Sequence, residues 1–339
     1  MAQPYQAIIV VSFGGPEGPD DVMPFLETVT KGRNIPRERL LEVAEHYLMF
    51  GGVSPINQQN RQLIAALKQE LDEAQLKLPI YWGNRNWHPF LADTVRQMAD
   101  DGIQQALAFV TSAFGSYSGC RQYLENIEQA RQTVGPRAPQ IDKIRGFFNH
   151  RGFILPMIDR TRTALEQIPA DRRSAARLVF TAHSITVSME QTSHYEQQLA
   201  EACRLVASGV EHDDWKLVYQ SRSGPPSQPW LEPDVCDYLR SLHEQNVQDV
   251  VLVPIGFISD HMEVLFDLDT EAQELAHSCG MNLVRAGTVG VHPQFIQMIA
   301  ELIVERLDET LPSSPLGQLP ACSHLCPSTC CPAPVRPPR

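Results

Sequence analysis

Residues 249–274 read DVVLVPIGFISDHMEVLFDLDTEAQE, and the fold of the chain can be worked out from this stretch. The apolar run at 250–253 predicts a buried strand, and a Pro-Ile-Gly-Phe turn leads from it into a helix. Along that helix carboxylates recur every four residues, at Glu263, Asp267 and Glu271, so an α-helix places them on one face. Like charges at this spacing weaken a helix. The row is therefore either a solvated face or a path that handles cations.

A second polar pair follows a strand in the same way. Residues 178–182, LVFTA, predict an apolar strand that ends at His183 and Ser184. Ligands of open α/β sheets bind outside the carboxyl ends of the strands. One imidazole and one carboxylate, each just beyond a strand, could hold a divalent transition metal without enclosing it. A hydrogen-bonded structural His183 and a solvated Glu263 remain the simpler explanation of this pattern alone.

Strands and helices alternate through the whole chain. The alternation predicts an α/β fold with two Rossmann-like lobes, each a parallel four-stranded sheet flanked by helices, and a cleft between them for a flat ligand. Strands are expected at 7–12, 79–83, 106–111, 143–147, 177–182, 216–220, 249–254 and 282–286. Helices are expected near 20–31, 37–49, 57–74, 89–100, 120–133, 151–167, 192–207, 233–245, 262–278 and 292–308. The expected domains are 1–147, 148–310 and a coreless tail at 311–339, where eight prolines stand.

Composition and charge argue against several classes of protein. The 339 residues carry a net charge of −12 and a pI near 5.4, which disfavours nucleic acid or an anionic membrane as the main partner. The segment MAQPYQAIIVVSF lacks the basic region of a signal peptide, and no apolar run approaches the ~18 residues of a membrane span. We therefore expect a cytoplasmic monomer without stable membrane insertion. The absence of a GxxxxGK[ST] loop argues against ATP as a cofactor.

Four of the eight cysteines lie within ten residues near the end of the chain: Cys322, Cys326, Cys330 and Cys331. In a reducing compartment such clustering indicates a metal or iron–sulfur site rather than disulfides. The spacing C-x3-C-x3-C-C differs from the paired CxxC motifs of zinc sites. A tail with incidental cysteines is the alternative.

Several of these motifs together resemble the ferrochelatase family, whose members insert ferrous iron into a porphyrin. TAHSI at 181–185 is similar to the family's S-A-H-S-L-P segment, and GFISDHMEVLFDLD at 256–269 is similar to its G-F-x-x-D-H-x-E-x-L-x-x-x-D segment. GGVSPI at 51–56 and QSRSGPPSQPWLEPDV at 220–235 follow in the family's order. The resemblance covers about 6–308. SFGGPEG at 12–18, SGCRQY at 118–123 and the cysteine tail are closest to the actinobacterial branch.

The resemblance implies a catalytic pair, His183 and Glu263, that face each other at the porphyrin centre. Two roles are open to His183: it accepts pyrrole protons, or it hands over the metal. The same ambiguity applies to which of the pair takes the first proton. Asp267 and Glu271 extend the metal site into a path by which hydrated Fe²⁺ could enter or protons could leave. Asp260 and His261 are expected to orient the helix by hydrogen bonds.

The resemblance also implies substrate contacts at Phe13, Ser54 and Tyr123. Phe13 lies in the glycine-rich SFGGPEG turn, which Pro16 and Glu17 make unsuited to phosphate. Some coproporphyrin-specific members place a Tyr there, whose hydroxyl can bind the product iron; Phe13 can only pack against the macrocycle. Ser54 and Tyr123 carry hydroxyls that could bond a propionate.

For the cysteines, the resemblance implies a [2Fe–2S] cluster held by tail residues and one internal ligand, for which Cys120 stands in the right segment. Five candidates then compete for four positions: Cys120, Cys322, Cys326, Cys330 and Cys331.

We therefore expect a ferrochelatase that acts on coproporphyrin III, with protoporphyrin IX as the alternative substrate. A cobalt chelatase is a further alternative, but those relatives use two His residues where this chain has His183 and Glu263. A non-catalytic tetrapyrrole or iron carrier is the alternative from a different class. A carrier would hold its metal with several ligands, whereas this pair is sparse.

Overall fold

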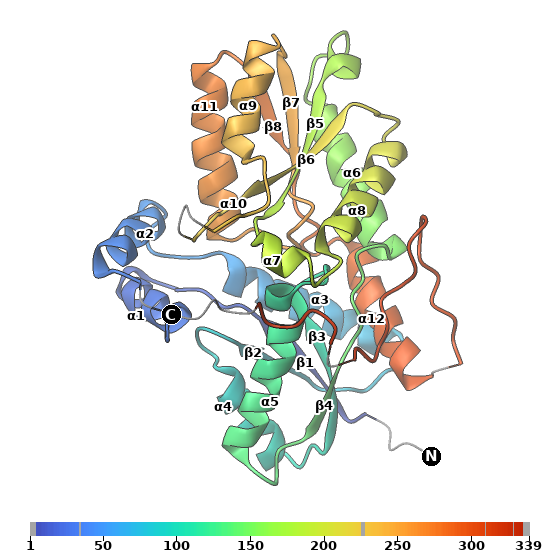
Figure 1. Cartoon of the computed structure of the whole chain (residues 1–339). Helices are drawn as coiled ribbons and strands as arrows, with labels where there is room; N and C mark the ends of the chain where they lie inside the picture. Colours follow the sequence, from blue (N-terminus) through green and yellow to red (C-terminus); the bar gives the residue numbers. More distant parts are fainter. Residues whose placement is uncertain (1–4, 34, 225–227, 309, 328, 335–339) are drawn as a thin grey trace. The chain divides into compact units, whose positions relative to one another are not determined.

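The computed structural model describes residues 5–33, 35–224, 228–308, 310–327 and 329–334 (Figure 1). These residues divide into two compact units. Unit 1 holds the described residues up to Thr111 together with 122–144 and 299–311, and unit 2 holds 112–121, 145–298 and the described part of the tail. Each unit contains one four-stranded sheet, as expected from the sequence.

The sheet of unit 1 is parallel and has the order β2-β1-β3-β4. Its strands are β1 (Ala7–Ser12), β2 (Ile80–Asn84), β3 (Gln105–Val110) and β4 (Gln140–Lys143). Every residue of β1 is buried, because both faces of the sheet are covered. The helices of this unit are α1 (Pro19–Val29), α2 (Arg37–Met49), α3 (Ile56–Glu73), α4 (Leu91–Asp100) and α5 (Gln122–Val134).

The strand expected at 143–147 lies a few residues earlier, because β4 runs from Gln140 to Lys143. Phe147 and Phe148, which follow β4, are buried in unit 2 instead. The Phe147 ring meets Phe153 and Phe295, each at 5.8 Å between ring centroids. Aromatic packing therefore takes over from sheet pairing at this point of the chain.

The sheet of unit 2 is also parallel and has the order β6-β5-β7-β8. Its strands are β5 (Arg177–His183), β6 (Trp215–Gln220), β7 (Asp249–Val253) and β8 (Asn282–Arg285). The two sheets therefore have the same strand order: in each, the strand that is first along the chain lies between the second and the third, and the fourth lies at the edge. Unit 2 also contains η1 (Tyr117–Arg121), α6 (Arg151–Leu165), η2 (Arg173–Ala175), α7 (Val187–Glu190), α8 (Tyr195–Gly209) and α9 (Val235–Glu244). The last helix, α12 (Pro293–Leu307), has its residues up to Met298 in unit 2 and the others in unit 1.

The helix expected at 262–278 is present but is not a continuous α-helix. It consists of α10 (Met262–Phe266), a π-helical segment η3 (Asp267–Ala272) and α11 (Gln273–Ser278). In η3 the backbone bonds run from i to i+5, so Asp267 and Glu271 do not follow the α-helical spacing that the sequence suggested. Such single-turn π segments are frequent at functional sites. Beneath them Leu268 and Ala272 pack on Val250 and Leu252 of β7.

The described part of the tail, 312–327 and 329–334, forms no helix or strand. It runs along unit 2, where Leu316 N–H donates to the Asn149 carbonyl at 2.9 Å and the Asn149 amide donates to the Leu319 carbonyl at 2.8 Å. Backbone and side-chain groups of Asn149 therefore supply hydrogen-bond partners for the tail backbone. None of the described helices is long and apolar enough to cross a membrane.

Candidate functional site

His183 ends β5 and Glu263 lies in the first turn of α10, as the strand-end argument requires. The Nδ1 of His183 lies 2.5 Å from the Ser184 carbonyl oxygen, which can only accept a hydrogen bond. Nδ1 therefore carries the hydrogen in the neutral ring, and the lone pair lies on Nε2. That Nε2 is 3.5 Å from Glu263 Oε1, with the two side chains 34% and 45% exposed. A half-exposed nitrogen and oxygen thus face each other.

The charges of these two side chains stabilise each other. Burial opposes a positive charge on His183, but the Glu263 carboxylate outweighs it and raises the pKa of His183 to about 9. Burial also opposes the charge on Glu263, whereas His183 holds the pKa of that carboxyl well below its usual range. Both pKa shifts favour an imidazolium–carboxylate pair at neutral pH. The imidazolium must give up its Nε2 proton before it can bind a metal ion or accept a further proton.

His261 caps the N-terminus of α10. Its Nδ1 accepts a hydrogen bond from the Glu263 N–H at 3.1 Å, and its Nε2 lies 4.0 Å from Glu263 Oε2. Its ring also meets the Phe257 ring edge to face at 4.8 Å. Burial lowers the pKa of His261, so the ring is neutral at pH 7 and can accept the capping bond.

Asp267 lies one turn further on and is held by β6 and the residue after it. Ser221 Oγ donates a short hydrogen bond to Asp267 Oδ2, and Gln220 Nε2 donates to the same oxygen at 3.2 Å. Burial is the main cause that raises the pKa of Asp267, to about 7, with Glu263 adding to it. Glu271 is exposed, and burial and nearby acids raise its pKa as well. Glu263 and Asp267 are thus partly exposed, and Glu271 is exposed.

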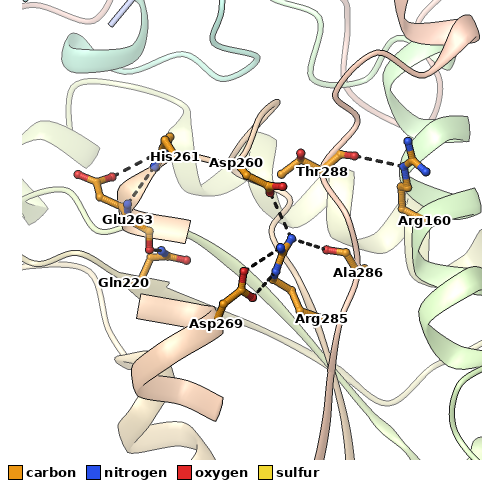
Figure 2. A network of polar contacts seen from close by, with 9 residues as sticks. All are labelled: Arg160, Gln220, Asp260, His261, Glu263, Asp269, Arg285, Ala286 and Thr288. Atoms are coloured by element: carbon orange, nitrogen blue, oxygen red, sulfur yellow. Dashed lines mark hydrogen bonds and ion pairs between the residues drawn. The ribbon is translucent and has the colours of Figure 1, made fainter. Parts of the chain in front are cut away.

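The structure adds Arg285, which the sequence did not single out (Figure 2). It stands at the end of β8 and pairs with both Asp260 and Asp269. Of the expected orienting pair, His261 caps the helix while Asp260 bonds to this arginine. The one feature of the sequence that indicates Arg285 is its position at the carboxyl end of a strand. Its pairing with distant carboxylates leaves no local pattern.

The three expected substrate contacts all lie in unit 1. Phe13 directly follows β1 and is 37% exposed. Ser54 is buried, and its N–H donates to the Pro16 carbonyl at 2.9 Å. The turn between them needs glycine: Gly14 has φ of +83°, and a Cβ at Gly15 would lie 2.6 Å from the Ser54 Cβ.

Tyr123 is buried in the core of unit 1, beneath an arginine that the sequence also did not single out. The Arg85 guanidinium carbon lies 4.4 Å from the centre of the Tyr123 ring and 5.8 Å from that of Phe13. Arg85 Nε also donates to Asn126 Oδ1 at 2.6 Å. Arg85 follows β2, so a cation and two aromatic rings meet at the carboxyl ends of β1 and β2.

The tail cysteines and Cys120 all belong to unit 2, and none of the cysteines forms a disulfide. Cys330 Sγ lies 3.7 Å from Cys331 Sγ. Burial first, and then the neighbouring Cys330 and Cys120 thiols, raise the pKa of Cys331 to about 12. Arg121, next to Cys120, donates to the Cys330 carbonyl at 2.8 Å. These contacts bring the internal cysteine next to the end of the tail.

Cys322 meets the same part of unit 2 through Gln198. The Gln198 amide donates to Cys322 Sγ at 3.7 Å and accepts from the Gly115 N–H at 2.7 Å, and a Cβ on Gly115 would lie 3.8 Å from Cys331 Sγ. Cys326 instead donates to the Ser323 carbonyl at 3.9 Å. Among the described residues, no group of three or more His, Cys, Asp or Glu side chains is arranged to hold a metal ion.

Comparison with known proteins gives a consistent result. A family model described as Ferrochelatase matches residues 5–307. A ferrochelatase from Rhodopirellula baltica is 56% identical and covers 99% of this chain and 96% of its own length. A coproporphyrin III ferrochelatase from Nocardia farcinica is 52% identical with 98% of both chains covered, and one from Streptomyces coelicolor is 49% identical with 98% and 94% covered.

Solved structures share the fold. SirB from Bacillus subtilis with Fe³⁺ has a TM-score of 0.56 at 12% identity and covers 90% of this chain and 97% of its own. The sirohydrochlorin chelatase SirB from Bacillus subtilis subspecies spizizenii in complex with cobalt has a TM-score of 0.53, with 12% identity and coverage of 90% and 96%. At this identity the likeness concerns the fold alone.

Proposed function

The chain belongs to the ferrochelatase family, and on that premise we propose that it inserts ferrous iron into coproporphyrin III to form coproheme. The observation that carries the proposal is the open pair of His183 Nε2 and Glu263 Oε1, 3.5 Å apart. Two ligand atoms from two elements can bind a divalent ion briefly and release it, whereas a closed set of four would retain it. The choice of coproporphyrin III rests on the relatives named for it.

The reaction exchanges two pyrrole N–H protons for one Fe²⁺ ion, so the site must accept protons and deliver the metal. We propose that His183 and Glu263 do both at the same face of the ring. The Nε2 proton of the imidazolium must first leave, and Asp267, with a pKa of about 7, can accept and release protons at neutral pH. Glu271 then provides the exposed end of a path to solvent. Asp267 and Glu271 would guide hydrated iron inward along the same path.

On the substrate side, we propose contacts with Phe13, Ser54 and Tyr123. The exposed Phe13 ring can pack on the macrocycle, and the nearby Arg85 guanidinium supplies a cation for a propionate. Ser54 and Tyr123 are both buried. Their burial supports a role for Ser54 in shaping the turn and for Tyr123 in holding Arg85, in addition to any direct bond to the porphyrin. Since Phe13 has no hydroxyl, the product iron would take its axial ligand from elsewhere.

We further propose a [2Fe–2S] cluster in unit 2, held by Cys120, Cys322, Cys330 and Cys331. The 3.7 Å between Cys330 and Cys331 Sγ fits two sulfurs on one tetrahedral metal with bonds of about 2.3 Å. The electrostatic influence of Cys120 on Cys331, and the contact of Cys322 with Gln198, support the other two ligands. Among the described residues these thiols are not yet arranged as a metal site. A bound cluster supplies a one-electron centre.

The test is anaerobic iron insertion followed by absorbance, with coproporphyrin III and protoporphyrin IX assayed side by side. We expect kcat/KM to be higher for coproporphyrin III, since four propionates engage more polar groups than two. A preference for protoporphyrin IX would contradict the substrate assignment. Failure with both, together with tight saturable binding of haem by titration calorimetry, would favour a carrier. We also propose a cytoplasmic monomer, which sedimentation analysis and cell fractionation can test.

A further inference from the structure

Arg285 contacts the chain on both sides of the residues that carry Glu263 and Asp267 (Figure 2). Its Nε and Nη2 donate to the two oxygens of Asp269 at 2.5 and 2.9 Å, and its Nη1 donates to Asp260 at 3.2 Å. The Arg285 side chain is only 16% exposed. Each nitrogen of the guanidinium therefore has a carboxylate partner in a setting where water screens the charges weakly.

The stretch between those two carboxylates is short and does not hold its own shape. The α-helix α10 has five residues, far fewer than an isolated helix needs, and it passes directly into the π segment η3. Asp260 directly precedes the capping residue His261, and Asp269 lies inside η3. The arginine thus joins the start of α10 to the middle of η3.

Arg285 and its two carboxylate partners together form a clamp on this stretch. The clamp is anchored in the sheet of unit 2. Arg285 is the last residue of β8 and pairs with Leu252 of β7, and the Ala286 N–H donates to the Leu252 carbonyl at 2.8 Å. Leu252 is fully buried. The backbone of Arg285 is therefore fixed, and the fixed backbone determines where Asp260 and Asp269 can lie.

We propose that Arg285 is a positioning residue for metal insertion: by holding Asp260 and Asp269 it fixes the direction in which Glu263 points toward His183. This inference rests on the proposed function. The planar guanidinium binds Asp269 with two parallel bonds while a third reaches Asp260, and a lysine ammonium cannot keep this geometry. Without the clamp, α10 and η3 can shift relative to β5, and the gap between Glu263 and His183 changes with them.

The test compares Arg285→Gln, Arg285→Lys and Asp260→Asn with Arg160→Gln as the matched control. Arg160 belongs to the same polar region, but its Nε donates to the Thr288 carbonyl at 3.2 Å (Figure 2). Asp260→Asn removes the charge of one partner and leaves the paired bonds to Asp269, so it is the milder variant if the arginine variants fold poorly. Iron insertion, coproporphyrin III binding by fluorescence quenching, and crystal structures of the variants are measured.

We expect kcat/KM for iron to fall about 10- to 100-fold in both Arg285 variants and less in Asp260→Asn, since a ligand misplaced by about 1 Å can cost 100-fold. The porphyrin dissociation constant should stay within about twofold, which separates positioning from general unfolding. In the crystal structures the Nε2–Oε1 separation should depart from 3.5 Å.

If the wild type inserts iron and all three variants turn over like Arg160→Gln, the inference is wrong and the proposed function stands. Arg285→Lys with full activity would also overturn it, since charge alone would then suffice. If the wild type inserts no iron, the proposed function fails, and an unchanged His183–Glu263 geometry in the variant crystal structures would then separately refute the clamp.

Discussion

Glu201 on α8 accepts a hydrogen bond from the backbone N–H of Gln318 at 2.5 Å, which ties the C-terminal tail to unit 2. The carboxylate also binds Arg204 with two bonds of 2.9 Å and is itself buried. The carbon of a side chain at Gly317 would collide with it, so the tail approaches Glu201 through a glycine. A charged acceptor thus holds a segment that has no secondary structure of its own.

This contact predicts that tail docking depends on pH. Hydrogen bonds from Arg204, and then from the Gln318 N–H, lower the pKa of Glu201 below its ordinary value. The stabilisation is therefore present above the unfolded-state pKa of about 4.3 and is lost as pH falls through the lower folded-state value. We expect Glu201→Gln to speed amide hydrogen exchange in 315–320 at pH 7, because a bond to a charged acceptor contributes about 1.5–3 kcal/mol.

The control for that prediction is Glu211→Gln, an exposed position just beyond α8. It should leave exchange in the tail unchanged. Equal exchange in the wild type and Glu201→Gln, after correction for intrinsic rates, would show that the tail does not depend on this carboxylate.

Replacement of His183 by Ala should abolish iron insertion, with a loss of at least about 100-fold in kcat, because a positioned acid–base group contributes 10² to 10⁴. Porphyrin binding should persist. His243→Ala is the control, since His243 is exposed on α9 and remote in sequence from the site. Near-normal turnover by His183→Ala would refute the site assignment.

Glu263→Gln should lower the pKa of His183 from about 9, because burial then acts without the opposing carboxylate. Because the folded-state pKa of His183 lies above the unfolded-state value of 6.5, the ion pair stabilises the folded protein fully below pH 6.5. This stabilisation is lost as the pH rises through about 9. Imidazole ¹⁵N shifts of the metal-free protein measure the change. A pKa for His183 near 6.5 in the wild type would rule out the ion pair.

The cluster proposal predicts which cysteine is dispensable. Anaerobically purified wild-type protein should contain two iron and two sulfide ions per chain, as a [2Fe–2S] cluster requires. Serine at Cys120, Cys322, Cys330 or Cys331 should remove the visible absorbance, and Cys326→Ser should keep it. Wild-type protein without acid-labile sulfide, or loss of the cluster in Cys326→Ser alone, would contradict the assignment.

The turn after β1 predicts a strict requirement at Gly15. Gly15→Ala places a carbon 2.6 Å from Ser54 Cβ and 2.9 Å from Ile56 Cγ2, so we expect a loss of about 1–3 kcal/mol in unfolding free energy from overpacking. Gly287→Ala, whose new carbon would meet Arg160 at an ordinary 3.5 Å, is the control. Urea denaturation of both variants measures the difference.

The sequence predicted those features that have a local pattern. His183 could be found because parallel strands present their carboxyl ends to ligands, and Glu263 because it opens the next helix after β7. The π segment could not be predicted, because carboxylates spaced four residues apart are typical of an α-helix. The hydrogen bonds that Ser221, Gln220 and Arg285 make to this segment come from distant parts of the chain.

The contacts of Arg85 and Arg285 could not be predicted from the sequence for a related reason. A guanidinium gains its meaning from partners that only the fold brings near, such as Tyr123 for Arg85 and Asp269 for Arg285. The cysteines show the reverse case. Their clustering in the sequence led to the prediction of an iron–sulfur site, which stays a prediction, while the electrostatic influence of Cys120 on Cys331 depends on the fold.

Residues 299–311 belong to unit 1, although they follow most of unit 2 in the chain. Arg306 donates to Tyr5 Oη at 2.5 Å and pairs with Asp142 at 3.4 Å, and both partners are made long before it. A ribosome delivers the chain from the N-terminus, so unit 1 cannot complete its packing until residues 145–298, most of unit 2, have been made. The sheet of unit 2 can therefore finish folding before unit 1 does, the reverse of the order in which their first strands are made.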